Sequence, residues 1–247
     1  MTARLYSLAV SHPALAAHCM LTHKGVEHAV VDLLPGTQPV VLRALRFPRY
    51  TVPALALDGR RIQGSREIAR ALEEIQPDPP LFPCEPAARA RVEEAERWGE
   101  QVLQPVPRRI FRWMAANHYD VRRWLAVDVA RVPLGGVLTR PALQAQLLAR
   151  AVGADAPTVR ADLAALGNRL AEVERLRAAG VIDGTQLNAA DFQIASTLRS
   201  LAAFADLAPY LEAHPAIRWA ATVVPAPPGP VPRALPRAWV EPLRGAV

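Results

Sequence analysis

The chain has 247 residues, of which 51% are hydrophobic and 21% charged, and its formal net charge is +6. These values are typical of a soluble globular protein with room for one large domain or two modest ones. No run of about eighteen apolar residues occurs, so a membrane-spanning helix is not expected. The first residues lack the apolar core of a signal peptide, and we therefore expect a cytoplasmic protein.

The positive charge comes almost entirely from arginine and reflects a composition bias of the whole chain. The densest group comprises Arg108, Arg109, Arg112, Arg122 and Arg123. Aromatic residues alternate with these arginines, a pattern that is compatible with stacking on nucleic acid. At helical spacing, however, aromatic residues usually belong to the core and arginines to a solvated rim. We therefore do not expect a nucleic-acid partner.

The first predicted elements are a strand, a helix and a second strand. Residues 3–10 read as a strand, which ends at Ser11-His12-Pro13. Proline suits the first turn of a helix, and the helix ends at Lys24-Gly25. Residues 27–34 form the second strand, and a weakly helical patch follows at 41–45.

The stretch from Tyr50 to Glu74 predicts two strands and a strongly amphipathic helix. Asp58-Gly59 separates the apolar run 52–57 from the short run 60–63, which is typical of a tight hairpin. A proline at the start of the first run predicts a cis peptide between Val52 and Pro53. Ser65 is placed at the N-cap of the helix. A strand edge beside a helix N-terminus can hold a peptide-like ligand that carries a carboxylate.

The second half of the sequence predicts helices only. Residues 77–86 contain five prolines and read as a stiff connector. Asn188 and Asp191 form a predicted capping box, with a role in folding. From residue 222 the chain is too rich in proline for helix or sheet, with Trp239 and Leu243 as anchors. The helices are expected at 87–104, 108–117, 120–130, 141–152, 157–179 and 189–204, with an interruption at Pro105 and Pro107.

Three motifs together resemble the cytosolic glutathione S-transferase superfamily, in its serine-type, theta/zeta/phi-like members. They are LYSLAVSHPALAAHCMLTHKG, FPRYTVPAL and VIDGTQLNAADFQIA. The resemblance implies an α/β thioredoxin-like N-terminal domain of βαβαββα order, followed by an all-α C-terminal domain. It also implies a homodimer. The predicted divisions are residues 1–76, a linker at 77–86, a helical domain at 87–221 and a tail at 222–247.

The resemblance implies that Ser11 is the catalytic residue and that glutathione is the co-substrate. A thiol with a pKa of about 8.5 is mostly protonated at neutral pH, so a hydroxyl donor beside a helix N-terminus would favour the thiolate. Ser11 can equally act as the cap of the helix that Pro13 begins. His12 could line the site or serve as a second donor, but we expect it to have no direct role.

The same resemblance implies contacts for the tripeptide. Val52 beside the cis Pro53 would pair with the cysteinyl unit, Ser65 would bind the γ-glutamyl carboxylate, and Gln38 would bind the glycine carboxylate. Gly64 occupies the position of a usual acidic or Gln residue that meets the glutamyl ammonium. The pocket for the electrophile is expected between the domains, with a wall made by Gln104, Arg108 and Phe111.

Neither the cysteines nor the histidines predict a metal site. Cys19 and Cys84 form no CxxC pair, and the early histidines, at 12, 18, 23 and 28, are spaced around a helix. The leading hypothesis is a transferase-like enzyme that activates glutathione, or a similar small thiol, for attack on a small electrophile. The alternative is a binding or interaction protein that keeps this fold and has weak or no activity.

Overall fold

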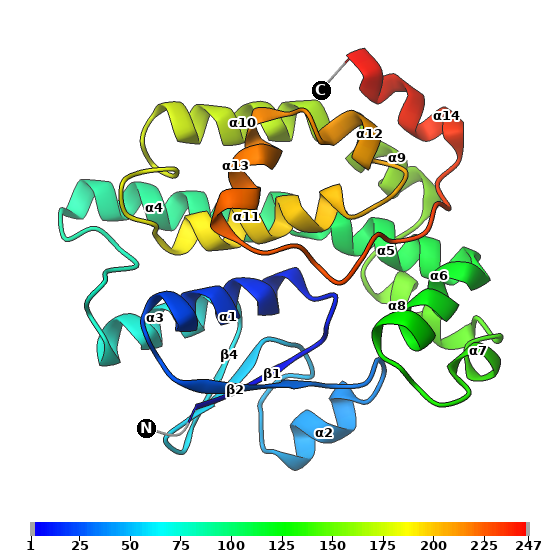
Figure 1. The fold of residues 1–247 in the computed structure, drawn as a ribbon, viewed down its shortest axis with the longest axis horizontal. Coiled ribbons are helices and arrows are strands. Elements are labelled where there is room, and N and C mark those ends of the chain that lie inside the picture. Colours follow the sequence, from blue (N-terminus) through cyan, green and yellow to red (C-terminus); the bar gives the residue numbers. More distant parts are fainter. Residues whose placement is uncertain (1–2, 246–247) are drawn as a thin grey trace.

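A computed structural model describes residues 3–245, and its N-terminal part is built on a four-stranded sheet (Figure 1). The strand order is β2-β1-β3-β4. The parallel pair is β1 (Ala3–Ser7) with β2 (His28–Asp32), and β3 (Ala54–Leu57) runs antiparallel to both β1 and β4 (Arg60–Gln63). The β3–β4 turn has positive φ at Asp58 (44°) and Gly59 (86°), which confirms the predicted hairpin.

Helices cover both faces of this sheet because its strands alternate apolar side chains between them. Leu5 and Leu55 face the main core, which they share with α1 (His12–His23) and α3 (Ser65–Ile75). Tyr6 and Ala54 face the opposite side and pack in a smaller cluster with Leu42 of α2 (Gln38–Ala44). The predicted βαβαββα order is confirmed.

The helical part begins with two helices joined by a π-helical turn, η1 (Gly99–Leu103). The sequence predicted an interruption of the helix at Pro105, which has no N–H to donate. In the structure this interruption is the π-helical turn η1. The predicted helix over 157–179 is wrong in one respect: it divides at Ala165, where ψ is 2°, and Leu166 then turns into the core. The bounds are α4 (Pro86–Trp98), α5 (Pro105–Asn117), α6 (Tyr119–Arg123), η2 (Trp124–Val129), α7 (Gly135–Leu138), α8 (Leu143–Ala151), α9 (Ala156–Ala164), α10 (Leu166–Ala178), α11 (Ala189–Ala202), α12 (Ala208–Leu211), α13 (Pro215–Val223), α14 (Arg237–Val240) and η3 (Glu241–Gly245).

Helix α11 lies at the centre of the molecule, packed against α1, α4 and α13 (Figure 1). Its N-terminus carries the predicted capping box, which is confirmed. The Asn188 Oδ1 accepts from Ala190 N at 2.9 Å, and Asp191 Oδ2 accepts from Asn188 N at 2.8 Å. This cap starts the helix at the point where it meets the N-terminal part, so its role is structural.

The segment from residue 222 is more ordered than predicted. It contains the end of α13, α14 and the 3₁₀ turn η3, and Val231 pairs with Phe204 in a parallel bridge. The expectation of no helix or sheet here is therefore wrong. Helix α14 begins directly after Pro236, at its cap, where proline does not break a helix. Five side chains of this segment are buried in the main core: Val224, Val231, Leu235, Val240 and Leu243.

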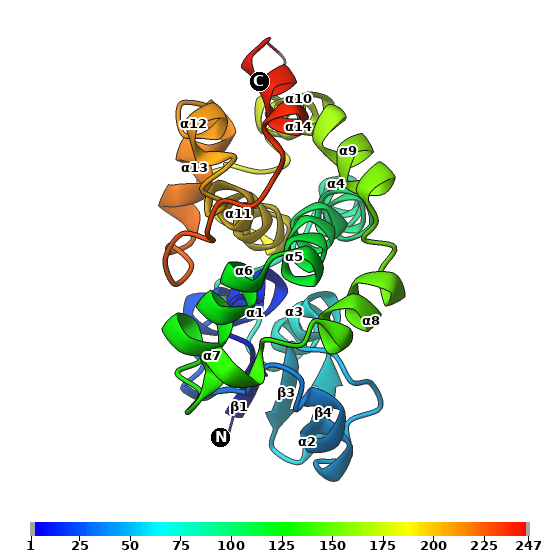
Figure 2. The ribbon, with the colours of Figure 1, turned by 90° about the vertical axis from the view of Figure 1, so that its right-hand side faces the viewer.

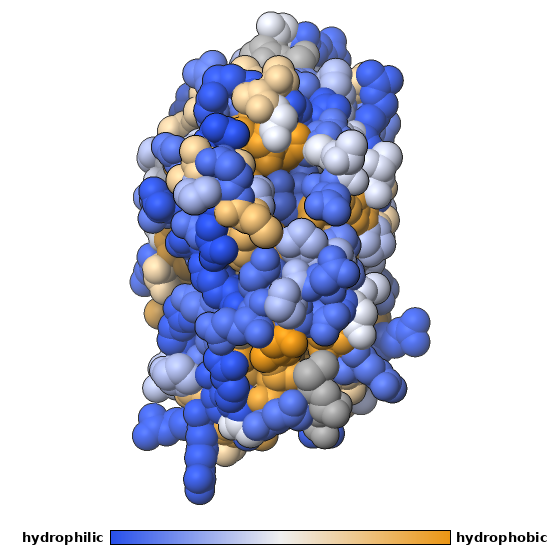
Figure 3. Space-filling model, turned by 90° about the vertical axis from the view of Figure 1, so that its left-hand side faces the viewer, coloured by the Kyte–Doolittle hydropathy of each residue, from blue (hydrophilic) through white to orange (hydrophobic). Residues whose placement is uncertain are grey.

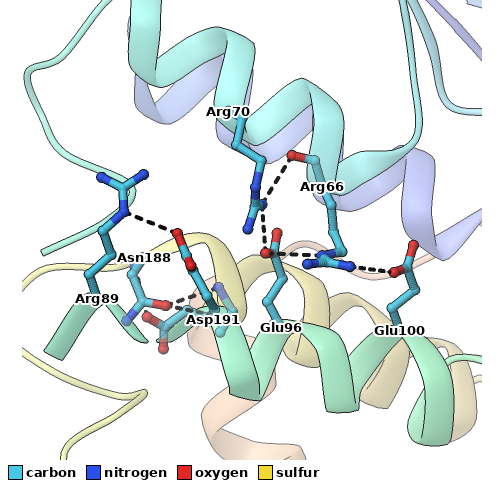
Figure 4. A network of polar contacts seen from close by, with 9 residues as sticks. Arg66, Arg70, Arg89, Glu96, Glu100, Asn188 and Asp191 are labelled. Carbon is cyan, nitrogen blue, oxygen red and sulfur yellow. Dashed lines mark hydrogen bonds and ion pairs between the residues drawn. The ribbon is translucent and has the colours of Figure 1, made fainter. Parts of the chain in front are cut away.

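A polar network joins α3 to α4 at the junction of the two parts (Figure 4). Arg70 Nη1 lies 2.6 Å from Glu96 Oε2, and Arg66 contacts both Glu96 (3.2 Å) and Glu100 (3.1 Å). Glu96 is buried, and burial raises the pKa of its carboxyl while the two arginines oppose that shift. Two guanidinium groups around one buried carboxylate hold α3 in a fixed position on α4.

The outer surface is mainly polar. On the face that lies at the left of Figure 1, apolar side chains form several small separate patches among polar ones (Figure 3). Viewed from the opposite side, α5 and α6 lie above α1, while α7 and α8 flank the sheet (Figure 2). Within residues 3–245, no helix has the length and apolar character needed to cross a membrane.

Candidate functional site

The turn between β1 and α1 presents Ser11 at the N-terminus of a helix. Ser11 has extended backbone angles (φ −86°, ψ 102°), and its Oγ accepts from Ala14 N at 3.3 Å, so it caps α1. Its side chain is half-buried. A cap of this kind uses an oxygen lone pair, so the hydroxyl hydrogen is left to donate to another group.

Sheet register brings the cis-proline loop to the end of β1. Tyr6 pairs with Ala54, and the two residues before Ala54 are Val52 and Pro53. The peptide between them is cis, as predicted. Among residues 3–245, Val52 makes no backbone hydrogen bond, because regular pairing starts only at Ala54. Its N–H and C=O can therefore pair with an extended ligand.

The N-terminus of α3 lies beside the same loop. Gly64 N donates to Pro53 O at 3.0 Å. The predicted N-cap is corrected by one residue: Gly64, at φ 103° and ψ 143°, is the cap, and Ser65 is the first helical residue. A residue with a side chain rarely adopts this φ, which is why the cap falls on glycine. Ser65 is buried, and within the described residues its hydroxyl has no partner.

Glu67 and Arg49 fill the space next to Gly64. A Cβ added at Gly64 would lie 2.1 Å from Glu67 Oε2 and 3.2 Å from Arg49 Nη2. The two side chains form an ion pair at 3.5 Å, and both are more than half exposed. Sequence reasoning missed this pair. Through this ion pair, the Glu67 carboxylate lies next to Gly64, which has no polar side chain of its own.

Two glutamines predicted or found near the site bind backbone groups of neighbouring loops. Gln63 is buried, and its side chain accepts from Arg49 N at 2.7 Å and donates to Arg49 O (2.7 Å) and Thr51 O (2.9 Å). It therefore fixes the segment that leads to the cis peptide. Gln38 Oε1 accepts from Gly36 N at 3.0 Å, which leaves the Gln38 amide N–H groups as donors.

Across the site, α5 brings Gln104 and Arg108 to His12. Arg108 Nη2 donates to Gln104 Oε1 at 2.8 Å. His12 is buried, and burial together with the positive charge of Arg108 lowers its pKa to about 3, against a backbone hydrogen bond at Gln104 that raises it. His12 is thus neutral at physiological pH and cannot act as a general acid there. Its Nε2 is buried without a partner in the described chain.

Phe111 lies one further turn along α5, where its ring meets Trp124 edge-on at a centroid distance of 6.4 Å. Gln104, Arg108 and Phe111 are spaced at four and three residues and so share one face of the helix. Arg112, which the sequence did not single out for this wall, is half-buried on the same helix. This part of α5 thus carries an exposed arginine (Arg108), a half-buried one (Arg112) and one member of an aromatic pair (Phe111). Helix α5 lies on the α1 side of the helical part (Figure 1).

Two other members of the arginine group have structural partners. Arg109 binds both oxygens of Asp162, at 2.6 and 2.8 Å, and Arg122 donates to three backbone carbonyls. His18 Nδ1 lies 2.8 Å from His28 Nε2, which links α1 to β2. In the described part of the chain, no three potential metal ligands come together. Burial raises the pKa of Cys19 to about 11, so this thiol is unreactive.

Comparison with known proteins finds one family model that matches the N-terminal part of the chain. Residues 5–80 match the family model of the glutathione S-transferase N-terminal domain. No curated protein sequence matches the chain. Several solved structures share its fold over nearly the whole length.

A glutathione S-transferase from Rhodospirillum rubrum is 24% identical and covers 97% of this chain and 98% of its own, with a TM-score of 0.61. The β-etherase LigF from a Sphingobium species is 20% identical, covers 98% of both chains and has a TM-score of 0.60. A Methylobacterium radiotolerans glutathione S-transferase, solved with glutathione sulfonate, is 20% identical and covers 95% and 100%, with a TM-score of 0.53.

Residues 5–80 are therefore similar to a glutathione S-transferase N-terminal domain, and the chain shares the fold of these solved structures over nearly its whole length. The predicted fold class, a thioredoxin-like sheet followed by a helical region, is confirmed. The serine-type subclass, the divisions at residues 76, 86 and 221, and the roles of individual site residues stay predictions.

Proposed function

We propose that the protein is a cytoplasmic, homodimeric glutathione transferase-like enzyme that activates a small thiol for attack on a small electrophile. The thiol is glutathione or a close relative of it. The observation that carries the proposal is the meeting of three features at one sheet edge. They are the Ser11 cap, the unpaired Val52 backbone before the cis Pro53, and the N-terminus of α3 at Ser65.

Ser11 is assigned the catalytic role of hydrogen-bond donor to the thiolate. Its cap on Ala14 N uses the oxygen as acceptor, so donation to sulfur does not compete with helix capping. The partial positive charge at the N-terminus of α1 favours the anion further. Both effects lower the pKa of the bound thiol below the ordinary value of about 8.5.

The tripeptide would lie extended along the cis-proline loop. Val52 would pair with the cysteinyl backbone, and Ser65 with the free N–H groups of α3 would bind the γ-glutamyl carboxylate. Glu67 would then accept from the glutamyl ammonium, the contact that Gly64 lacks. Gln38 would donate to the glycine carboxylate through the amide that faces away from Gly36.

The second candidate function is binding without chemistry, and the Arg49–Glu67 pair favours it. Arg49 holds the Glu67 carboxylate beside the N-terminus of α3, so a ligand carboxylate can bind there only if Glu67 turns away. An exposed ion pair of this kind contributes about 0–1 kcal/mol. Its opening is therefore a small obstacle, and we prefer the enzyme.

Calorimetric titration with glutathione tests the proposal, together with conjugation to 1-chloro-2,4-dinitrobenzene. We expect binding at millimolar glutathione or below, with a bound-thiol pKa that rises toward about 8.5 in Ser11→Ala. Ser7→Ala is the matched control, since Ser7 ends β1 four residues before Ser11 and its hydroxyl donates to Leu8 O at 3.2 Å. The absence of binding would refute the enzyme and its thiol together. Binding with no turnover in the natural protein would favour the second candidate.

A further inference from the structure

The stretch from α7 to α8 carries a large share of the exposed apolar side chains. Among residues 3–245, twelve large apolar side chains are exposed, and half of them lie between residues 134 and 148. Single exposed side chains of this kind are common, whereas a concentration of them marks an interaction surface. The six are Leu134 (77% exposed), Val137 (59%), Leu138 (65%), Leu143 (67%), Leu147 (54%) and Leu148 (37%).

The two helices hold these side chains on their outer sides. Leu138 N donates to Leu134 O at 3.0 Å, so the two leucines lie one helical turn apart. Leu143 and Leu147 have the same spacing in α8, whose inner side packs on α5 through the buried Ala149. Both helices lie on the face that is turned toward the viewer in Figure 2. We call this surface, formed by residues 131–150, the α7–α8 surface.

The α7–α8 surface is also positively charged. From residue 129 to residue 154 the sequence contains three arginines and neither aspartate nor glutamate. The three are Arg131, Arg140 and Arg150, and all are exposed. Their side chains form no ion pair or hydrogen bond with any of residues 3–245. Apolar side chains therefore stand here among cations that have no partner within the described chain, and the charge favours an anionic partner.

A second copy of this chain fits the surface poorly. In a twofold dimer the same surface would meet its own copy, which would bring three unpaired arginines against three others. Like charges that face one another across an interface cost free energy. Leucines beside unpaired arginines are instead typical of helices that lie on a membrane. There the leucines enter the boundary of the acyl chains, and the arginines are attracted to the anionic head groups.

We propose that the α7–α8 surface binds the surface of an anionic lipid bilayer. Leu134, Leu138, Leu143 and Leu147 supply the apolar contact, and the three arginines supply the attraction to lipid phosphates. Two such signals together give reversible binding at the interface. This contact is peripheral, and it needs no helix that crosses the bilayer. It is independent of the thiol chemistry proposed above.

Vesicles that contain lipid alone test the proposal, because they exclude an acidic protein as the partner. We expect the full chain to float with vesicles made of equal parts of phosphatidylglycerol and phosphatidylcholine. Binding to pure phosphatidylcholine should be weaker by about tenfold or more, because the attraction of the arginines to anionic lipid is lost. Added salt should weaken binding to the anionic vesicles, since it screens exposed charges.

Two double variants separate the apolar and the charged contributions. Leu143→Gln with Leu147→Gln should weaken binding to anionic vesicles by about tenfold or more, because two apolar side chains no longer leave water. Arg140→Gln with Arg150→Gln should weaken it by about tenfold and leave binding to pure phosphatidylcholine unchanged. All four side chains are exposed, so each variant should keep the melting temperature of the natural protein.

Matched controls remove similar groups outside the α7–α8 surface. Val30→Gln with Ile75→Gln removes two exposed apolar side chains, from β2 and from the end of α3. Arg160→Gln with Arg218→Gln removes two exposed arginines of α9 and α13. Neither control should change the binding to vesicles.

Three outcomes would overturn the proposal. The first is failure of the natural protein to bind anionic vesicles, and the second is a loss in the controls equal to that in the leucine variant. The third comes from sedimentation without lipid: a dimeric natural protein and a monomeric leucine variant would assign the surface to contact between copies. Conjugation of glutathione, measured without lipid in the same variants, should not change. Absence of conjugation with the expected vesicle binding would refute the enzyme and leave this surface standing.

Discussion

The amine of Lys24 lies 2.5 Å from a carboxylate oxygen of Glu73, and its side chain is completely buried. Lys24 also donates to the carbonyls of Gln76 (2.6 Å) and Pro77 (3.3 Å). The same oxygen of Glu73 accepts from Leu81 N at 2.9 Å. This one ion pair therefore joins the end of α1 to α3 and to the connector that leads into the helical part.

Lys24→Met should lower the free energy of unfolding by about 3 kcal/mol, because it leaves Glu73 with one buried partner fewer and the carbonyls of Gln76 and Pro77 without this donor. Chemical denaturation measures this. The double variant Lys24→Met, Glu73→Gln should recover part of the loss, since the uncompensated charge is then removed. If the single and double variants were equally stable, the ion pair would not be the cause.

The free energy of unfolding should decrease as the pH is lowered, because of His12. Its folded-state pKa of about 3 lies below the ordinary value of 6.5, so unfolding takes up a proton between these limits. The contribution is complete above pH 6.5 and is lost as the pH falls toward 3, at about 1.4 kcal/mol per pH unit within the window.

Carboxylates titrate in the same pH range. The effect of His12 is therefore measured as the difference in pH dependence between the natural protein and a His12 variant. We expect the slope of unfolding free energy against pH, between pH 6 and 4, to be smaller in His12→Asn by roughly the amount expected for one proton. His118→Asn provides a control at a half-buried histidine. Equal slopes in the His12 variant and the natural protein would show that His12 titrates normally.

Gly64→Ala should destabilise the protein by about 1–3 kcal/mol. The φ of 103° costs a residue with a Cβ free energy, and that Cβ would displace Glu67 from the α3 N-terminus. Thermal unfolding measures the change. Gly59→Ala, with φ 86° and open space at its Cβ, gives the backbone cost alone. An equal decrease in melting temperature in the two variants would mean that displacing Glu67 costs no free energy.

Arg112→Met should keep or raise the melting temperature. The folded protein bears a desolvated charge at this position without a partner, and burial depresses its pKa, so the charged form is disfavoured by folding. Arg109→Met should lower the melting temperature, because it leaves buried Asp162 with one arginine, Arg169, in place of two. A loss of stability in Arg112→Met similar to that in Arg109→Met would indicate a structural role for both.

The parts of the fold that were predicted correctly are those with strong local signals. Asp58-Gly59 predicted the hairpin, Pro53 the cis peptide, and Asn188 with Asp191 the capping box, because each depends on residues close in sequence. The cap of α3 was misplaced by one residue, since Ser65 has the typical side chain but Gly64 has the required φ. Tail helix α14 was missed because prolines flank it without entering its interior.

The contacts of the site that were missed are those made between distant residues. Glu67 reads as an ordinary first-turn acid, and only the conformation of Gly64 and Arg49 brings it over the helix N-terminus. Arg112 belongs to a cluster in which Arg109 and Arg122 turned out to be structural. A periodic pattern cannot tell a paired from an unpaired arginine, because the partner Asp162 lies 53 positions away.

The last turns of the chain have a consequence for how the protein is made. Val240 and Leu243 are buried in the same core as α11, and Trp239 packs on Trp113 of α5 at a centroid distance of 4.7 Å. During synthesis the N-terminal sheet can form early, because its strands all lie within the first 63 residues. The helical core is complete only after Leu243 has left the ribosome. Until then the apolar groove that receives this segment is open to solvent and to chaperones.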